Sequence, residues 1–289
     1  MTKAFLVLTS PPGHATLCDA VLAKLADTVP ALPTAQALVA HEAVEFALAE
    51  PADMAEKTAA ALAGLPVDVN LVPAENRRKA LLVADLESTI IEQECLDELA
   101  VNIGRQAEME DITARAMRGE LDFEPALRER VAMLTGLPEA DLQRLYDEVI
   151  TLMPGAETML AGLKKAGLTC GLVSGGFTFF ASRIAERLNF DRFRANHLLL
   201  DKGAVTGKVA EPILGRAAKA EIMAEWCAEL GLQVENVLAV GDGSNDLAML
   251  QAAGMGVAFR AKPLVAEAAR YRIDHGDLTA LLHLQGIAV

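Results

Sequence analysis

Three short segments of the chain carry side chains that together could act on a phosphate group. They are Asp85-Leu86-Glu87 after the apolar run 80–84, Ser174-Gly175-Gly176, and the segment that holds Asp242, Asn245 and Asp246. Lys219 lies in a helix-like stretch just before the third segment. Carboxylates, a hydroxyl, bare backbone amides and a lysine are the groups that phosphoryl transfer uses. The residue types therefore predict this chemistry, provided that the fold brings the segments together.

Each group has a role that its chemistry suits. Asp85 can attack phosphorus and form an aspartyl phosphate, and Glu87 can protonate the leaving oxygen and then activate water. Several carboxylates without thiolates or histidine pairs favour a hard, oxygen-binding cation, which we expect to be Mg²⁺. This cation would offset the repulsion between carboxylate and phosphate. Ser174-Gly175-Gly176 brings a hydroxyl and backbone N–H groups close to an anion, and Lys219 adds fixed positive charge.

The elements around these segments predict a common location for them. From Lys79 onward, strand-like apolar runs alternate with helical stretches, with strands expected near 80–85, 168–176, 236–243 and 255–259. Alternating strands and helices with almost continuous apolar strands are typical of a parallel sheet that is covered on both faces. Ligands of such sheets bind at the carboxyl ends of the strands. All three segments lie at such ends.

The first part of the chain has a different pattern. Residues 3–8 read as a strand, and the stretch up to about residue 72 continues as helix, two strands, helix and strand. This βαββαβ order is that of a ferredoxin-like domain. The charged segment 73–79 contains a proline and suits a linker. We therefore predict a small α+β domain over residues 1–75 and an α/β domain over residues 76–289.

Composition excludes some classes of partner. The chain has 289 residues, 52% of them apolar, and a formal net charge of −14, so the basic footprint of a nucleic-acid-binding protein is absent. No segment approaches the roughly 20 apolar residues that span a bilayer. The four cysteines form no C-x-x-C pair and no signal peptide is visible, so we expect reduced thiols and a cytoplasmic protein. A homodimer is allowed, although the sequence does not fix the oligomeric state.

Longer segments carry a resemblance to a known family. The segments "IEQECLDELA", "LRERV", "VSGGFTFFA" and "GDGSNDLAML" are similar to those of the haloacid-dehalogenase-type phosphatases, and within them to the phosphoserine phosphatases. The resemblance covers residues 80 to 285 and implies a Rossmann-like core, residues 76–91 and 151–289, with a helical cap over about 92–150. Residues 1–75 resemble the ACT-like domain of some of these enzymes. The implied activity is Mg²⁺-dependent hydrolysis of O-phospho-L-serine, the last step of serine biosynthesis.

The resemblance also implies a role for individual residues. Asp85 is the nucleophile and a metal ligand, Glu87 gives a backbone carbonyl to the metal and its side chain to acid–base work, and Asp242 completes the protein ligands. The substrate and phosphate contacts are Glu94 for the ammonium, Arg130 for the carboxylate, Phe123 over the ligand, and Ser174, Gly175, Gly176, Lys219 and Asn245 around the phosphate. Asp246 supports this end of the site.

Position 87 departs from the family pattern D-x-D-S-T, because this chain has Glu where the family has Asp. The two acids have nearly the same reference pKa, so acidity is kept. The side chain is longer by one methylene, and if it reaches its position imperfectly, Glu87→Asp would raise turnover. The metal contact expected here uses the backbone and need not suffer.

Two alternatives to phosphoserine hydrolysis remain open at this point. One is a phosphatase for another small ester, such as phosphothreonine or a sugar phosphate, which a substrate panel would separate. The other is a binding protein that senses an amino acid and is catalytically weakened by Glu87. Retained turnover would argue against the second alternative.

Overall fold

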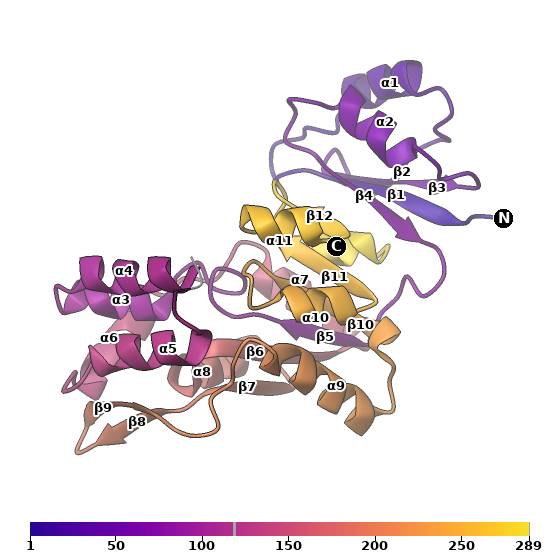
Figure 1. The fold of residues 1–289 in the computed structure, drawn as a ribbon. Helices are drawn as coiled ribbons and strands as arrows, with labels where there is room; N and C mark the ends of the chain where they lie inside the picture. The colour runs from indigo at the N-terminus through magenta and orange to yellow at the C-terminus, as the bar shows by residue number, and fades with distance from the viewer. Residues whose placement is uncertain (118–119, 289) are drawn as a thin grey trace.

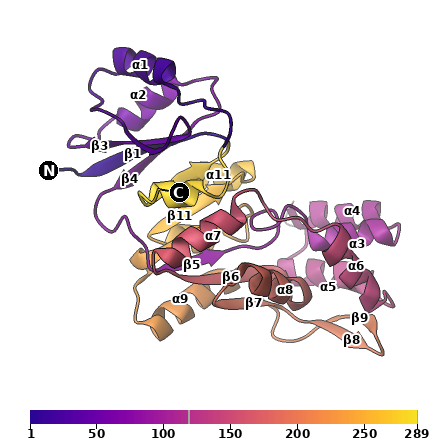
Figure 2. The same cartoon turned by 180° about the vertical axis from the view of Figure 1, so that it is seen from behind.

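The computed structural model describes residues 1–117 and 120–288 of the chain. Arg118 and Gly119, which belong to the predicted cap, lie outside the described residues. The described chain forms a small α+β domain, a central α/β core and a group of cap helices (Figure 1). The small domain and the cap lie on different sides of the core in both views (Figures 1 and 2). No helix in the described ranges is both long and apolar enough to cross a membrane.

The N-terminal domain has the βαββαβ order that the sequence predicts. Its elements are β1 (Ala4–Thr9), α1 (Asp19–Thr28), β2 (Gln36–Val39), β3 (Ala43–Leu48), α2 (Met54–Ala61) and β4 (Asp68–Pro73). The strands form an antiparallel sheet in the order β2-β3-β1-β4. A separate apolar cluster fills the space between this sheet and its two helices, with Leu6, Leu25 and Phe46 among its members.

The core is a six-stranded parallel sheet in the order β12-β11-β10-β5-β6-β7. Its strands are β5 (Leu81–Ala84), β6 (Thr169–Phe177), β7 (Arg192–Asn196), β10 (Val237–Gly241), β11 (Met255–Phe259) and β12 (Tyr271–Ile273). The expected fold class, a parallel α/β core with a helical insertion and a small α+β domain before it, is confirmed. The two strands that precede Asp85 and Asp242, β5 and β10, are neighbours at the centre of the sheet.

Helices cover both faces of this sheet. They are α7 (Ala156–Lys165), α8 (Thr178–Leu188), α9 (Ala218–Leu230), α10 (Leu247–Ala252), α11 (Pro263–Ala268) and α12 (Ala280–Leu284), with a 3-10 turn at Val234–Asn236. Leu82 of β5 packs in the cluster with α7, α8 and α12, whereas Leu81 and Val83 pack in the cluster with α9 and α10. Successive strand residues face opposite sides, so burial on both faces explains why the strands are almost entirely apolar.

The cap follows β5 along the chain, and its described residues form four helices. These are α3 (Cys95–Asn102), α4 (Gln106–Met117), α5 (Phe123–Ala132) and α6 (Glu139–Glu148). An antiparallel hairpin, β8 (Leu198–Asp201) and β9 (Ala204–Val209), leaves the core after β7 and packs β9 against α5. The sequence analysis did not predict this hairpin, which joins residues of the core segment to the cap.

The N-terminal domain is attached to the core through β12 and α12. Asn70 on β4 donates from its amide to the carbonyl of Arg272 at 2.7 Å and accepts from the N–H of Arg272 at 2.9 Å. Asp68 accepts hydrogen bonds from the backbone N–H groups of residues 274–276. Arg77 in the linker forms a buried ion pair with Glu45. The linker is therefore held in place, because Arg77 also donates to the carbonyl of Leu284 in α12.

Candidate active site

Asp85 directly follows the central strand β5 and is 5% exposed. Its Oδ1 lies 2.6 Å from Nζ of Lys219 and accepts the N–H of Leu86 at 2.7 Å. Burial and the neighbouring Asp246 raise the pKa of Asp85, and Lys219 opposes this shift. Burial alone would lower the pKa of Lys219, but Asp246 and Asp85 outweigh it and the net shift is upward. Lys219 therefore carries its charge and favours the carboxylate form of Asp85.

Asp242 and Asp246 lie opposite Asp85 at the end of the adjacent strand β10. Carboxylate oxygens of these three residues lie within 4.8 Å of one another, and all three side chains are buried. Asp246 accepts from Lys219 at 2.6 Å and from the N–H of Gly243 at 3.0 Å. Burial, followed by the charges of Asp246 and Glu94, raises the pKa of Asp242 to about 6, against the opposing effect of Lys262.

This donor set fits a divalent metal ion. Three buried carboxylates share this site with Lys219, which pairs with two of them, and Lys262 lies 3.7 Å from the third. An excess of negative charge therefore remains in a buried site. A hard cation with oxygen ligands would neutralise that excess. The group of carboxylates that could hold a metal ion includes Asp246, for which the sequence predicted a supporting role, and contains no side-chain atom of Glu87.

The side chain of Glu87 points toward the cap instead. Its Oε1 accepts the N–H of Cys95, the first residue of α3, at 3.0 Å. A Cβ on Gly176 would lie 2.6 Å from its Oε2, so the carboxyl group rests on the bare backbone of Gly176. Burial, followed by the charge of Glu94, raises the pKa of Glu87 to about 7. A carboxyl group with this pKa exchanges a proton readily at neutral pH, which is what general acid–base catalysis requires.

The Ser-Gly-Gly segment forms the end of β6, next to Asp85. Ser174 is 1% exposed, and its Oγ accepts the N–H of Gly176 at 2.8 Å. A Cβ on Gly175 would contact the ring of Phe123 at 3.4 Å, so Phe123 of the cap lies over this segment. A cavity of about 490 Å³ opens beside it, lined by residues 121–125 and by Gly215 and Arg216. The cavity therefore lies between the start of the cap helix α5 and the segment that leads into α9.

Glu94 and Arg130, the predicted contacts of an amino-acid substrate, both lie near Glu87. Glu94 accepts from the hydroxyl of Ser88 at 2.8 Å, and its charge acts on Glu87. Arg130 pairs with Asp97 at 3.0 Å and contributes a favourable charge to the ionised form of Glu87. The structure therefore places an anionic and a cationic side chain on the cap side of the site.

Asn245 is half-buried beside Gly243, on the turn that carries Asp242 and Asp246. Three residues near the site carried no signal in the sequence analysis. Cys95 binds Glu87, Lys262 lies 3.7 Å from Asp242, and Asn196 binds the backbone of Gly175. The last two come from segments without a chemical motif, so only the tertiary fold identifies them.

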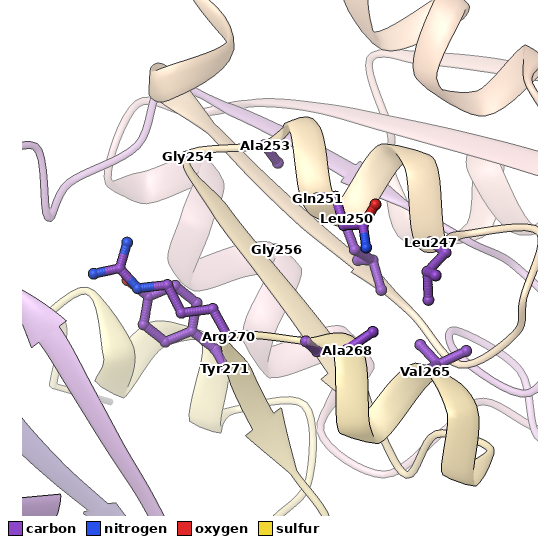
Figure 3. A pocket seen from close by; sticks show the side chains of 11 residues that line it. Leu247, Leu250, Gln251, Ala253, Gly254, Gly256, Val265, Ala268, Arg270 and Tyr271 are labelled. Atoms are coloured by element: carbon purple, nitrogen blue, oxygen red, sulfur yellow. The ribbon is translucent and has the colours of Figure 1, made fainter.

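A separate cavity of about 230 Å³ lies between α10, α11 and β11. Figure 3 shows that Leu247, Leu250 and Val265 point into it from two helices, with Arg270 and Tyr271 at one end. Its lining contains no member of the carboxylate group. We therefore place the chemistry at the strand ends and not in this smaller, separate cavity.

Comparison with known proteins identifies the family of this chain. The family model for haloacid dehalogenase-like hydrolases matches residues 82–251. The chain is 44% identical to a phosphoserine phosphatase of Albidiferax ferrireducens, over 71% of this chain and 88% of the relative. It is 42% identical to a phosphoserine phosphatase of Streptomyces coelicolor, over 85% of this chain but only 60% of that longer relative.

Solved structures of haloacid dehalogenase-like hydrolases also superpose on this chain. A haloacid dehalogenase family hydrolase of Salmonella enterica serovar Typhi superposes with a TM-score of 0.88 at 28% identity, over 99% of both chains. A structure described as a phospho-aspartyl intermediate analogue of phosphoserine phosphatase superposes with a TM-score of 0.67 at 38% identity, over 71% of this chain and 98% of that chain. The chain therefore belongs to the haloacid dehalogenase-like hydrolases and, within them, to the phosphoserine phosphatase family.

Proposed function

We propose that this protein hydrolyses O-phospho-L-serine to L-serine and phosphate through an aspartyl phosphate on Asp85, as the last step of serine biosynthesis. The observation that carries the proposal is the pairing of two unlike carboxyl groups. Asp85 is paired with the ammonium of Lys219, which opposes the upward shift that burial and Asp246 cause in its pKa. Glu87 instead accepts the N–H of Cys95, and its pKa is raised to about 7. The first group is suited to attack, and the second to carry a proton.

In the first step, an oxygen of Asp85 attacks phosphorus and the bond to the serine oxygen breaks. Glu87 gives its proton to that oxygen, so L-serine leaves as a neutral alcohol. In the second step, the Glu87 carboxylate takes a proton from water, and the water oxygen attacks the phosphorus of the aspartyl phosphate. Phosphate leaves and Asp85 is restored as a carboxylate. Lys219 and the backbone of Gly176 stabilise the charge on the phosphoryl oxygens.

We propose Mg²⁺ as the metal, held by Asp85 and Asp242 with Asp246 and the backbone carbonyl of residue 87 close by. When bound, the ion would polarise the phosphoryl oxygens and reduce their repulsion with Asp85. The fit of three buried oxygen donors supports this choice over metals that favour sulfur or imidazole ligands.

The substrate side of the proposal rests on the cap. Glu94 would bind the ammonium group of phosphoserine and Arg130 its carboxylate. Arg130 pairs with Asp97 in this structure, so the substrate carboxylate would compete with that pair. Phe123 would cover the bound ligand and limit access of water. We also propose a cytoplasmic location, which the four free cysteines support. We further propose that the protein assembles as a homodimer.

The test is phosphate release from O-phospho-L-serine, with and without Mg²⁺, beside O-phospho-L-threonine and a sugar phosphate. Phosphoserine should be the best substrate, and removal of Mg²⁺ should abolish turnover. Asp85→Asn should lower kcat by at least about 10³-fold, because it removes the attacking charge. Near-normal turnover of Asp85→Asn, with the fold intact by circular dichroism, would disprove the mechanism.

A further inference from the structure

Asn196 is a buried polar residue that no part of the proposed mechanism uses. It is the last residue of β7 and is 2% exposed. β7 pairs with β6, the strand that carries Ser174, Gly175 and Gly176 (Figure 1). The Nδ2 of Asn196 donates to the carbonyl of Gly175 at 2.8 Å. Its Oδ1 accepts the N–H of Leu214, also at 2.8 Å. One side chain thus joins the phosphate-side segment of β6 to the segment that leads into α9.

The bond to Gly175 has a consequence for the neighbouring N–H group. The carbonyl of Gly175 and the N–H of Gly176 belong to the same planar trans peptide unit, so they point in opposite directions. Fixing the carbonyl on Asn196 therefore fixes the N–H toward the Ser174 hydroxyl, which it contacts at 2.8 Å. Glycine on both sides of this peptide makes rotation easy, because neither residue has a Cβ to restrict it.

The bond to Leu214 connects the same side chain to the lysine of the site. Leu214 lies four residues before Ala218, where α9 begins, and Lys219 is in the first turn of that helix. The chain just before Leu214 is also linked to the cap, because Glu211 pairs with Arg128 of α5. Asn196 is therefore placed to set the spacing between the Gly176 N–H and the Lys219 ammonium, the two groups that would share the phosphate.

We propose that Asn196 is a positioning residue, which locks the Gly175–Gly176 peptide with its N–H on the Ser174 hydroxyl, at the phosphate side of the site, and aligns it with the approach to Lys219. The inference deepens the proposed phosphatase function and rests on it. Loss of Asn196 would let the glycine peptide rotate and would remove one oriented donor from the phosphoryl group. A displacement of about 1 Å in such a donor set can cost about 10²-fold in rate.

The experiment compares Asn196→Ala and Asn196→Asp with a matched control, Asn70→Ala. Asn70 is also buried, at 4% exposure, and also makes a pair of backbone hydrogen bonds, but it lies at the domain interface away from the site. Asn196→Asp keeps the shape and the acceptor for Leu214 but turns an oxygen toward the Gly175 carbonyl. The readouts are kcat and KM for phosphoserine, thermal stability, and the dissociation constant of inorganic phosphate by calorimetry.

We expect both Asn196 variants to lower kcat by about 10²-fold and to weaken phosphate binding by about tenfold, with Asn70→Ala changing only thermal stability. Phosphate binding and kcat within twofold of the parent in either folded Asn196 variant would overturn the inference. Equal losses in Asn70→Ala would do the same, because they would indicate general loosening. If the parent does not hydrolyse phosphoserine, the proposed function fails, and phosphate binding alone still decides the role of Asn196.

Discussion

At the scale of single residues, Glu87 shows how the site accommodates a departure from the family pattern. The longer side chain does not crowd the nucleophile. It extends to the N–H of Cys95 and rests on Gly176, where any Cβ would collide with it. The carboxyl group is therefore anchored in place, so we expect a site built around glutamate, in which Glu87→Asp would not raise turnover.

The first prediction concerns this anchoring. Glu87→Gln keeps the length and can still accept the Cys95 N–H, but it cannot give and take a proton, so kcat should fall by about 10²- to 10⁴-fold. Glu87→Asp keeps the acid but retracts it from Cys95, so its kcat should lie between that of the parent and Glu87→Gln. Steady-state kinetics at saturating Mg²⁺ measures both. Equal turnover of parent and Glu87→Gln would remove residue 87 from the mechanism.

The second prediction concerns pH. Glu87 must hold a proton to release serine, and its pKa is raised from 4.5 to about 7. The protonated fraction falls as pH rises through that value, so the rate of serine release in a single turnover should decrease above about pH 7. Rapid-quench experiments between about pH 6 and pH 8 measure this step. Glu87→Gln is the control, and its rate of serine release should be low and should not change with pH. A flat profile for the parent would contradict the assignment.

Sequence and structure agree best at the residues that lie at or near the carboxyl ends of core strands. Asp85, Ser174 and Asp242 could be placed together from the sequence, because parallel strands bring their carboxyl ends to one edge. Asn196 could not be placed in the site from the sequence. Its hydrogen-bond partners can be identified only once the pairing of β7 with β6 is known. The contact between Glu87 and Cys95 was equally hidden, since it depends on where the cap helix α3 begins.

At the scale of elements, the hairpin β8–β9 extends the cap with residues from the core segment. The pattern of apolar residues did not predict this hairpin. A short hairpin on the outside of a domain needs neither a long apolar run nor apolar residues at helical spacing. Two glycines in the hairpin, Gly203 and Gly207, both adopt positive φ. Only Gly207 is also closely packed, because a Cβ there would lie 2.1 Å from Oγ1 of Thr135, after α5.

The third prediction uses this difference. Gly207→Ala should lower the free energy of unfolding by about 3 kcal/mol, because it adds a clash to an unfavourable φ. Gly203→Ala meets no atom within 4 Å and should cost only about 1 kcal/mol. Urea denaturation measures both. The KM for phosphoserine should rise in Gly207→Ala, because β9 supports α5 and hence Phe123. Equal stability losses in the two variants would show that β9 does not press on α5.

At the scale of the whole molecule, all residues of the proposed chemistry lie beyond the linker, but the two domains are not independent. Val7 and Val72 of the N-terminal domain belong to the main apolar cluster of the core. Asp68 and Asn70 hold the segment that includes β12. The sequence predicted a linker around 73–79, but it could not predict this docking, since the contacts join residues about 200 positions apart.

The fourth prediction concerns removal of the first domain. A chain that starts at Asn76 should fold and keep most of its turnover, because it retains every group proposed to act on the substrate. Its stability should fall by roughly 2 to 4 kcal/mol, since the apolar surface under Val7 and Val72 becomes exposed. Thermal unfolding and phosphate release, compared with the full chain, measure both. A folded, metal-loaded but inactive product would make the first domain part of the catalytic unit.

The paired hydrogen bonds of Asn70 with Arg272 also bear on how the protein avoids aggregation. β4 and β12 are both outer strands, and an outer strand with free backbone groups is a template on which another chain can add a strand. The Asn70 amide occupies both backbone groups of Arg272 as a neighbouring strand would. The N-terminal domain therefore shields one open border of the central sheet, and this protection helps to keep folded molecules separate at high concentration.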